Sequence, residues 1–360
     1  MVTETLCTHA RPPTSTEMEK DKSEPSATKH PPAGALNRFH GNPVLTPIPE
    51  HDWESKYVLN AASVKLGRKV YMLYRSFGED KISRIGLAVS EDGFNFTERM
   101  DKPIFAPAVK WEGHGCEDPR LTVIGERIYM TYTAFDGFTA QIAVASITIK
   151  EFLNCRWESW HRHGLFSPGL KDKDATLFPD QFGGKVAMLH RLDPDIWLTF
   201  SSDLRCPWPA NCHLVLARPT KGEGWDSLKI GAGAQPIKTR YGWLLITHGV
   251  DHSKVYRLGV MLLDLDNPAK LIYRSPNFIL EPMTRYEMGG DDSSWVPNVV
   301  FTCGAVPMEN DKNLLDSEDE LVVYYGGADS VMNVATATVG DLIPEEVRYS
   351  ELDKSRSVSV

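Results

Sequence analysis

The stretch KVYMLYRSF at residues 69–77 decides the fold, because four later segments repeat it. Aligning the five copies superposes Tyr74, Tyr132, His190, His248 and Tyr325. The first four of these positions are 58 residues apart, and the fifth follows after 77 residues, with the added length in turn-like segments at 283–294 and 308–320. A near-constant period across four copies indicates a repeat architecture and disfavours the main alternative, two stacked β-sandwiches.

Each copy has the same internal order of segments. A strand with a polar head comes first, such as NAASVKLG at 60–67, then a tight turn, the apolar strand and a third strand, such as SRIGLAVS at 83–90. A repeat of about 58 residues with three strands and room for a fourth is typical of a propeller blade. We therefore predict an all-β fold, a five-bladed β-propeller that spans residues 37–345.

The two ends of the chain differ in composition from this domain. Residues 1–36 are rich in Pro, Ser, Thr, Glu and Lys and contain no Phe, Tyr or Trp, so they cannot offset the entropy of ordering a core. We predict a disordered tail at 1–36 and a C-terminal extension at 346–360.

Composition argues against several classes of function. The chain of 360 residues carries 39 Lys and Arg against 48 Asp and Glu, a net charge of −9, which disfavours a nucleic-acid partner. No stretch approaches the roughly 18 apolar residues of a membrane span, and the N-terminus lacks a signal-peptide layout, so we expect a cytoplasmic protein without a membrane partner. The six cysteines include no C-x-x-C pair, and His161 and His163 lack a third spaced ligand, so we expect no metal and no cofactor.

The repeat also predicts a site, because the innermost strand of every propeller blade lines one central channel. Polar residues stand at the heads of four first strands, namely Asn60, Asp118, Asp174 and Asn298. Polar or ionisable residues also end the second strands, among them Arg75, Tyr132, Arg191 and His248. A purely structural repeat would carry Gly, Ser or aliphatic residues at several of these places, so the convergence predicts a binding pocket.

The sharpest local motif is GHGCEDPR at 113–120. Pro119 disfavours helical backbone angles at Asp118, so we expect an extended backbone that aims this carboxyl into the channel. The structural alternative is a turn aspartate or an ion pair with Arg120.

Most of the candidate cationic residues occupy matching positions of the repeat. They are Arg75, Arg191, Lys173, Lys238 and His248, with Tyr256 nearby in the sequence. Donors converging from several blades would form a compact anion site, since guanidinium groups bind phosphate through paired hydrogen bonds. The alternative for any one of them is an ordinary exposed cation at a strand end.

Taken together, the motifs resemble those of the mannoside phosphorylases of glycoside hydrolase family 130 over about residues 38–345. They are GxGCEDPR at 113–120, SRIGLAxSxDG at 83–93, KDAxLFP at 173–179, KIGAGAxPIKT at 229–239, PNVVFxCGA at 297–305 and YYGxAD at 324–329. The resemblance implies a five-bladed propeller and inverting phosphorolysis of a β-mannoside. Its products would be α-mannose 1-phosphate and a shortened sugar, with inorganic phosphate as co-substrate.

The resemblance also implies roles for single residues. Asp118 matches the general acid, which in this family passes its proton through a hydroxyl of the mannosyl unit. Phosphate binding is expected of Lys173, Arg191, Lys238, His248 and Tyr256. Asn60 and Asp329 match sugar-binding positions. Apart from the resemblance, we also expect substrate binding of Arg75, Arg120, Tyr132 and Asp174.

The residue types themselves favour phosphorolysis over hydrolysis. An inverting hydrolase needs a second carboxylate that activates water, whereas phosphate is already an anion and needs cations that gather it. The carboxylates Glu117 and Asp174 leave a β-mannosidase open as an alternative, and a non-catalytic glycan-binding propeller is the third reading. The linkage, β-1,2 or β-1,4, stays open, as do the acceptor sugar and the assembly into a homo-oligomer.

Overall fold

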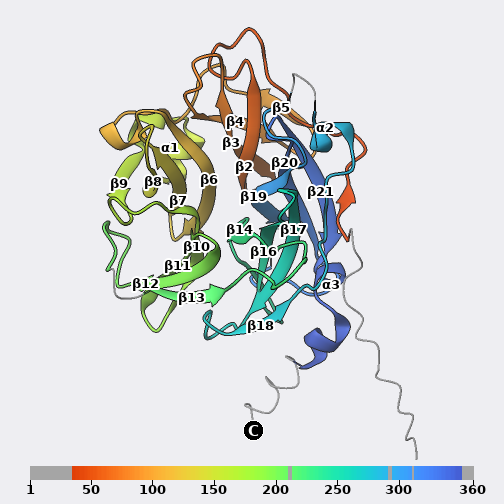
Figure 1. Ribbon diagram of the computed structural model, residues 1–360. Helices are drawn as coiled ribbons and strands as arrows, with labels where there is room; N and C mark the ends of the chain where they lie inside the picture. The colour runs from red at the N-terminus through yellow and green to blue at the C-terminus, as the bar shows by residue number, and fades with distance from the viewer. Residues whose placement is uncertain (1–34, 210–212, 291–293, 310–311, 351–360) are drawn as a thin grey trace, which may run out of the picture.

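The computed structural model describes residues 35–209, 213–290, 294–309 and 312–350. Viewed along a common axis, five antiparallel β-sheets are arranged as blades (Figure 1). The strands that contain the aligned repeat positions are the second strands of the five sheets, so the predicted five-bladed propeller is confirmed.

The blades follow one another along the chain. Blade 1 contains β2 (Tyr57–Leu66), β3 (Lys69–Phe77), β4 (Arg84–Ser90) and β5 (Phe96–Arg99). Blade 2 contains β6 (Gly115–Ile124), β7 (Arg127–Phe135), β8 (Ala140–Thr148) and β9 (His161–Leu165). Blade 3 contains β10 (Lys173–Phe182), β11 (Lys185–Leu192), β12 (Asp195–Ser201) and β13 (His213–Ala217).

Blades 4 and 5 differ slightly from this pattern. Blade 4 contains β14 (Lys229–Ala232), β15 (Ile237–Thr239), β16 (Gly242–Val250), β17 (Tyr256–Leu263) and β18 (Leu271–Arg274), because its innermost strand is split in two. Blade 5 contains β19 (Val300–Pro307), β20 (Glu320–Gly327), β21 (Val331–Thr338) and β1 (Asn37–Arg38). Short helices α1 (Ile149–Leu153) and α2 (Arg285–Met288) lie in connections between strands, and α3 (Val339–Leu342) follows the last strand.

The ring is closed by the start of the domain. Strand β1 pairs with β21 in antiparallel register, with Arg38 opposite Ala335, so the fourth strand of the last blade comes from the N-terminal side. The predicted tail boundary at residue 36 is two residues too late, since Ala35 and Leu36 are buried and the Leu36 amide donates to the Ile279 carbonyl (3.1 Å). Residues 1–34 and 351–360 of the predicted tail and extension lie outside the described residues.

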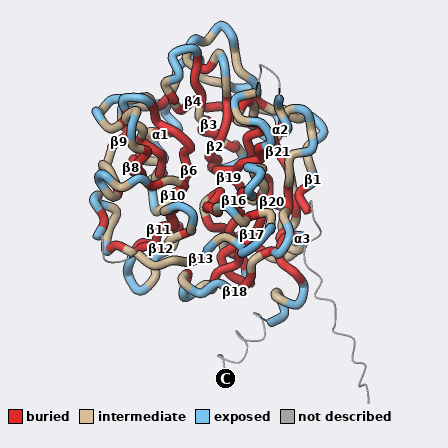
Figure 2. The backbone as a smooth tube through the Cα atoms, viewed as in Figure 1, coloured by how far each residue is buried: buried red, intermediate tan, exposed pale blue. Residues whose placement is uncertain are grey.

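The hydrophobic core lies between neighbouring blades. Leu73 of blade 1 packs in one cluster with Leu121 of blade 2, and Leu258 of blade 4 packs in another with Val323 of blade 5. Because inner strands are covered on both faces, they carry continuous apolar runs, and all nine residues of β16 are buried. Figure 2 shows this burial along the inner strands, with exposed segments mainly in the loops.

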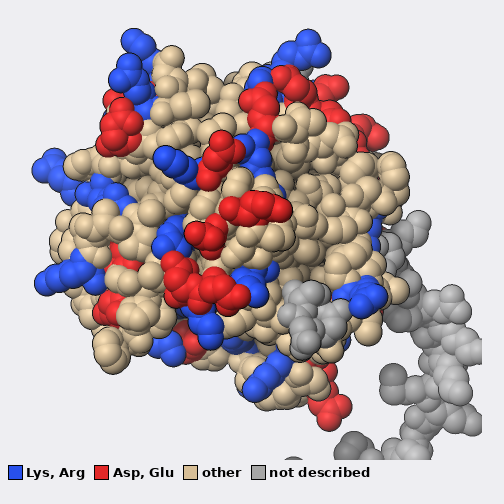
Figure 3. Space-filling view, turned by 90° about the horizontal axis from the view of Figure 1, so that it is seen from above, with Lys and Arg blue, Asp and Glu red and all other residues tan. Residues whose placement is uncertain are grey.

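Charged side chains of both signs lie on the face shown in Figure 3, where basic and acidic residues are interspersed. Among the described residues, no helix is both long enough and apolar enough to cross a bilayer.

Candidate active site

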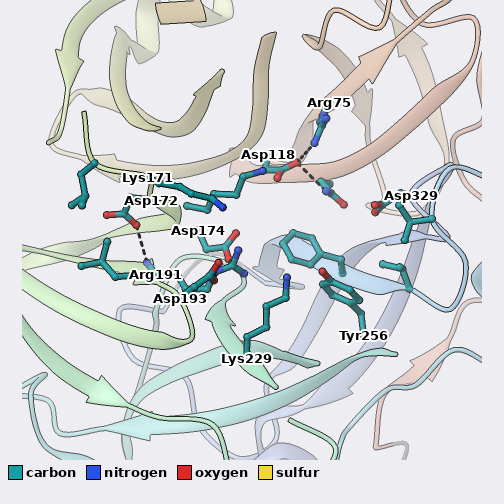
Figure 4. Close-up of a pocket in the computed structure, with 17 residues that line it drawn as sticks. Arg75, Asp118, Lys171, Asp172, Asp174, Arg191, Asp193, Lys229, Tyr256 and Asp329 are labelled. Carbon is teal, nitrogen blue, oxygen red and sulfur yellow. Dashed lines mark hydrogen bonds and ion pairs between the residues drawn. The ribbon is translucent and has the colours of Figure 1, made fainter. Parts of the chain in front are cut away.

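One end of the propeller axis, which we call the active end, holds a cavity of about 660 Å³. Every blade contributes to its wall, through Asn60 and Arg75 (blade 1), Asp118 (blade 2), Lys173, Asp174 and Arg191 (blade 3), Lys229 and Tyr256 (blade 4), and Phe301 and Asp329 (blade 5). Figure 4 shows Arg191 and Lys229 on one side of this space and Arg75, Asp118 and Asp329 on another.

β-bulges aim three of these side chains. Asn60, Asp118 and Asp174 each lie where the pairing register of the innermost strand shifts, and each has a positive φ of 49°, 49° and 57° respectively. Asn and Asp are the non-glycine residues that best tolerate this left-handed conformation. The bulge bends the strand and turns the side chain toward the axis.

The expected extended backbone at Asp118 is therefore wrong, although the carboxyl does line the cavity. Pro119 disfavours the right-handed helical region at the preceding residue, and a bulge takes Asp118 into the left-handed region instead. The alternative of an ion pair with Arg120 does not hold either. The guanidinium of Arg120 donates to the backbone carbonyl of Asp118 (3.1 Å) and not to its carboxyl.

The Asp118 carboxyl is held by two donors. Its Oδ1 accepts hydrogen bonds from Asn60 Nδ2 (2.9 Å) and Arg75 Nη1 (3.1 Å). Burial by itself would raise the pKa of Asp118, but the positive charges of Arg75, Lys173 and Arg120 outweigh burial and hold this pKa below its usual value. In the ligand-free site, Asp118 is therefore ionised at neutral pH.

Asp329 has the opposite ionisation state. Its burial, together with repulsion from the Asp118 carboxylate, raises the pKa of Asp329 to about 7, against the lowering effect of Arg75 and Lys173. The site thus contains one carboxyl that is ionised and one that holds its proton up to about neutral pH. Environments that separate two carboxyl pKa values in this way are typical of acid–base sites.

Two further carboxylates are committed to cations. Glu117 forms ion pairs with Arg75 Nη2 (2.9 Å) and Lys173 Nζ (3.2 Å). Asp174 lies between Arg191 Nη1 (2.5 Å) and Arg120 Nη2 (3.0 Å), and despite its burial these charges hold the pKa of Asp174 well below its usual value. Both groups act as supports for the cations beside them.

A comparison with family models identifies the family of this chain. The model for glycoside hydrolase family 130, described as beta-1,4-mannooligosaccharide phosphorylase, matches residues 35–344. The chain belongs to glycoside hydrolase family 130.

Curated relatives in family 130 match along most of their length. The chain is 42% identical over 314 residues to a beta-1,2-mannobiose phosphorylase of Thermoanaerobacter sp. (strain X514), covering 83% of this chain and 96% of that protein. It is 39% identical over 316 residues to a 1,2-beta-oligomannan phosphorylase of the same strain, covering 85% and 98%. A beta-1,4-mannooligosaccharide phosphorylase of Ruminococcus albus is 32% identical over 273 residues, covering 71% and 73%.

Solved family-130 structures have the same fold. A beta-1,2-mannobiose phosphorylase from Listeria innocua, in complex with beta-1,2-mannobiose, superposes with a TM-score of 0.72 at 26% identity, covering 88% of this chain and 99% of that one. A second structure has a TM-score of 0.73 at 26% identity and covers 87% and 96%; its description concerns family-130 glycoside hydrolases that target beta-1,2 mannosidic linkages in Candida mannan.

Eight of the twelve residues predicted from the sequence line the cavity of this family-130 chain. They are Asp118, Lys173, Arg191, Tyr256, Asn60, Arg75, Asp174 and Asp329. Arg120 and His248 are buried behind the wall, where both contact Asp174. Burial lowers the pKa of His248 despite the nearby Asp174 carboxylate, so its imidazole is neutral and adds no positive charge. Gly231 leaves the space that this ring occupies, since a Cβ there would lie 2.3 Å from His248 Cε1.

The expectation that Tyr132 faces the sugar is wrong. Its side chain is buried in the core between blades 1 and 2, where its hydroxyl donates to Glu112 Oε1 (2.5 Å). The aligned Tyr74 behaves in the same way, donating to Glu54 Oε2 (2.7 Å). These tyrosines follow the repeat because they satisfy buried carboxylates between blades.

Lys238 is also misplaced by the sequence prediction. It pairs with Trp243 at one end of β16, whereas Lys229 pairs with Val250 at the other end. Seven residues of strand separate these partners, about 23 Å. Lys238 therefore lies at the opposite end of the axis, in an ion pair with Asp180.

Lys229 is the lysine that the sequence prediction missed. Its Nζ lies 5.2 Å from the ring centroid of Tyr256, and it forms no ion pair with any residue that the structure describes. Both lysines belong to the motif KIGAGAxPIKT, and the split of the inner strand into β14 and β15 sends them to opposite ends. Lys171, Asp172 and Asp193 line the cavity as well and were not predicted.

Proposed function

We propose that the protein catalyses the inverting phosphorolysis of β-mannosides, with manno-oligosaccharide and inorganic phosphate as substrates. The observation that carries the proposal is that one cavity holds the Asp118 carboxyl together with Lys173 and, on another side, Arg191 and Lys229. The family and the names of its phosphorylase members support the same reaction.

Phosphate is the nucleophile that this arrangement suits. It is an anion at neutral pH. The Arg191 guanidinium, which also pairs with Asp174 and Asp193, can donate its remaining N–H groups to phosphate while lysine ammonium groups bind the other oxygens. A phosphate oxygen attacks the anomeric carbon, and the bond from that carbon to the bridging oxygen breaks on the opposite face. The products are α-mannose 1-phosphate and a sugar shortened by one unit.

The leaving oxygen must receive a proton, and Asp118 is the proposed donor, acting through a hydroxyl of the mannosyl unit. In the ligand-free site, its pKa is held low by Arg75, Lys173 and Arg120, of which Lys173 is also a proposed phosphate ligand. An incoming phosphate dianion offsets those positive charges and raises the pKa of Asp118, because a nearby negative charge favours the protonated carboxyl. Phosphate binding would thereby prepare the acid for the reaction.

Hydrolysis is disfavoured by the state of the other carboxylates. A water-activating base needs a lone pair directed at the attacking water. Glu117 is paired with Arg75 and Lys173, and Asp174 is paired with Arg120 and Arg191. Neither is free to act as that base while these ion pairs persist.

We assign the β-1,2 linkage to the preferred substrate. The two relatives at 39% and 42% identity are named for β-1,2-linked substrates, whereas the β-1,4 phosphorylase of Ruminococcus albus is 32% identical. Cytoplasmic localisation, the absence of cofactors and the oligomeric state stay predictions.

The test is an incubation of the protein with β-1,2-mannobiose or β-1,4-mannobiose, each with and without phosphate, followed by ¹H and ³¹P NMR. We expect α-mannose 1-phosphate and mannose from the β-1,2 substrate only when phosphate is present. Release of mannose at an undiminished rate without phosphate would identify a hydrolase, and absence of cleavage with bound sugar would identify a glycan-binding protein.

A further inference from the structure

A second cavity, which we call the outer cavity, lies beside the active-site cavity between blades 5 and 1. It has a volume of about 590 Å³. Its wall includes Lys56, Tyr57, Tyr286, Ser294, Ala328 and Ser330. The two cavities share a ridge, because Val296 and Asp329 line the active-site cavity while their neighbours Ser294, Ala328 and Ser330 line the outer one.

Trp295 lies on this ridge. Its backbone amide donates to Ser330 Oγ (2.9 Å), and the next amide, of Val296, donates to the Ala328 carbonyl (3.2 Å), so the two segments of the ridge are tied together. The Trp295 side chain is 46% exposed, which is unusual for so large an apolar group. The backbone of Trp295 thus lies between a residue that lines the outer cavity and one that lines the active-site cavity, and its partly exposed indole lines neither.

The indole is held in place from behind. The ring centroid of Trp295 lies 5.4 Å from that of Tyr57 and 5.2 Å from that of Phe77. The Arg75 guanidinium lies over the ring of Phe77, with its central carbon 5.6 Å from the ring centroid. Arg75 also donates a hydrogen bond to the Asp118 carboxyl. A rigid aromatic ring with exposed surface offers apolar contact to the C–H face of a pyranose at low entropic cost.

The reaction geometry directs the leaving sugar toward this ridge. In an inverting displacement, the nucleophile and the leaving group occupy opposite sides of the anomeric carbon. Arg191 and Lys229, the proposed phosphate ligands, belong to blades 3 and 4. The remainder of the substrate therefore points toward blades 1 and 5, where Trp295 and the outer cavity lie.

We propose that Trp295 and the outer cavity form a binding site for the distal sugar units of longer β-mannosides, beyond the disaccharide that spans the cleaved bond. The inference rests on the proposed function for its direction, and it makes Trp295 a determinant of chain-length preference. The indole stacks on a pyranose, and the outer cavity receives the unit that follows it.

The test compares wild type with Trp295→Ala on β-1,2-linked mannobiose and mannotetraose at saturating phosphate. We expect kcat/KM for mannotetraose to fall about 10-fold, which is within the range for loss of one aromatic contact, and kcat/KM for mannobiose to change less than 2-fold. Trp295→Phe should retain most of the preference, because it keeps an aromatic surface. The matched control is Phe138→Ala, since Phe138 is a 94% exposed aromatic residue in the turn between β7 and β8 of blade 2.

Equal losses on both substrates would overturn the proposal, because they would mean that Trp295 supports the ridge and not the distal sugar. An unchanged ratio between the two substrates would overturn it as well, as would an equal effect of Phe138→Ala.

A binding measurement separates this proposal from the proposed function. Isothermal titration calorimetry with mannobiose and mannotetraose, in the absence of phosphate, should show tighter binding of mannotetraose to wild type and loss of that difference in Trp295→Ala. If wild type produces no mannose 1-phosphate, the proposed function fails while this measurement still decides the distal site. Equal affinity of wild type for both sugars would overturn the distal site alone.

Discussion

The two ends of the propeller axis are built by the same inner strands, yet they differ in chemistry. At the active end, bulges place Asn60, Asp118 and Asp174 around a cavity that Lys229 also lines, and Lys229 forms no ion pair with a described residue. At the far end, a cavity of about 750 Å³ has mainly apolar walls, including Pro179, Val306 and Leu315.

Four lysines line the far-end cavity, and Lys238, the one predicted from the sequence to bind phosphate, is already engaged. Lys238 is paired with Asp180, and its Nζ lies 5.4 Å from the Trp243 ring centroid. A place on an inner strand is therefore not enough to make a residue functional. The end of the strand that a residue occupies decides whether it can face the active-site cavity.

The largest expected effect comes from removing one carboxyl group at each end of the propeller axis. Asp118→Asn removes the proposed proton donor and should lower kcat by about 10³-fold, within the range for general acid catalysis. Asp180→Asn, at the far end, should leave kcat within 2-fold. Initial rates of mannose 1-phosphate formation, with circular dichroism to check folding, measure both; near-wild-type activity in Asp118→Asn would end its assignment as the acid.

A smaller effect is expected from the two lysines. Lys229→Met should raise the KM for phosphate about 10- to 100-fold, since a hydrogen bond to a charged group contributes about 1.5–3 kcal/mol. Lys238→Met should leave the KM for phosphate unchanged, because its partner is Asp180. Rates measured against phosphate concentration decide the matter, and the reverse pattern would place the phosphate site at the far end.

The smallest effect concerns the pH dependence of stability. Because the pKa of Asp329 is about 7 in the folded protein and about 3.9 for an unperturbed Asp, the folded state binds the extra proton between these values. This contribution is fully present below the unfolded pKa and is lost as pH rises through about 7, with a slope of at most about 1.4 kcal/mol per pH unit.

Asp329→Asn mimics the protonated carboxyl and should lack that loss. Thermal unfolding of wild type and variant in phosphate-free buffer from pH 4.5 to 8.5 should therefore show wild type falling relative to Asp329→Asn and levelling off above about pH 7. A constant difference in melting temperature across this range would contradict the ionisation state assigned to Asp329.

Repeat spacing was sufficient to predict the fold. The five aligned copies gave the number of blades, and the aligned positions fell on the second strands as expected. The repeat also brought Asn60, Asp118 and Asp174 to one cavity. Asn and Asp occur at these three positions partly because the left-handed backbone conformation of the bulge favours them.

Burial and strand ends could not be predicted in the same way. Tyr132, His190 and His248 occupy the same position of the repeat. Whether a side chain at this position faces the cavity or the space between blades depends on its packing partners, such as Glu112 for Tyr132. The break between β14 and β15 has no sequence marker other than Pro236. Because of this break, the prediction placed Lys238 in the cavity, where the structure has Lys229.

The central claim, that phosphate is gathered at the active end, is tested most directly by a crystal structure of the protein with bound inorganic phosphate and mannose. The account predicts phosphate oxygens within hydrogen-bonding distance of Arg191, Lys173 and Lys229, with the sugar between them and Asp118. Phosphate bound at the far end beside Lys238, or sugar bound at the active end with those three cations turned away from the anion, would contradict it.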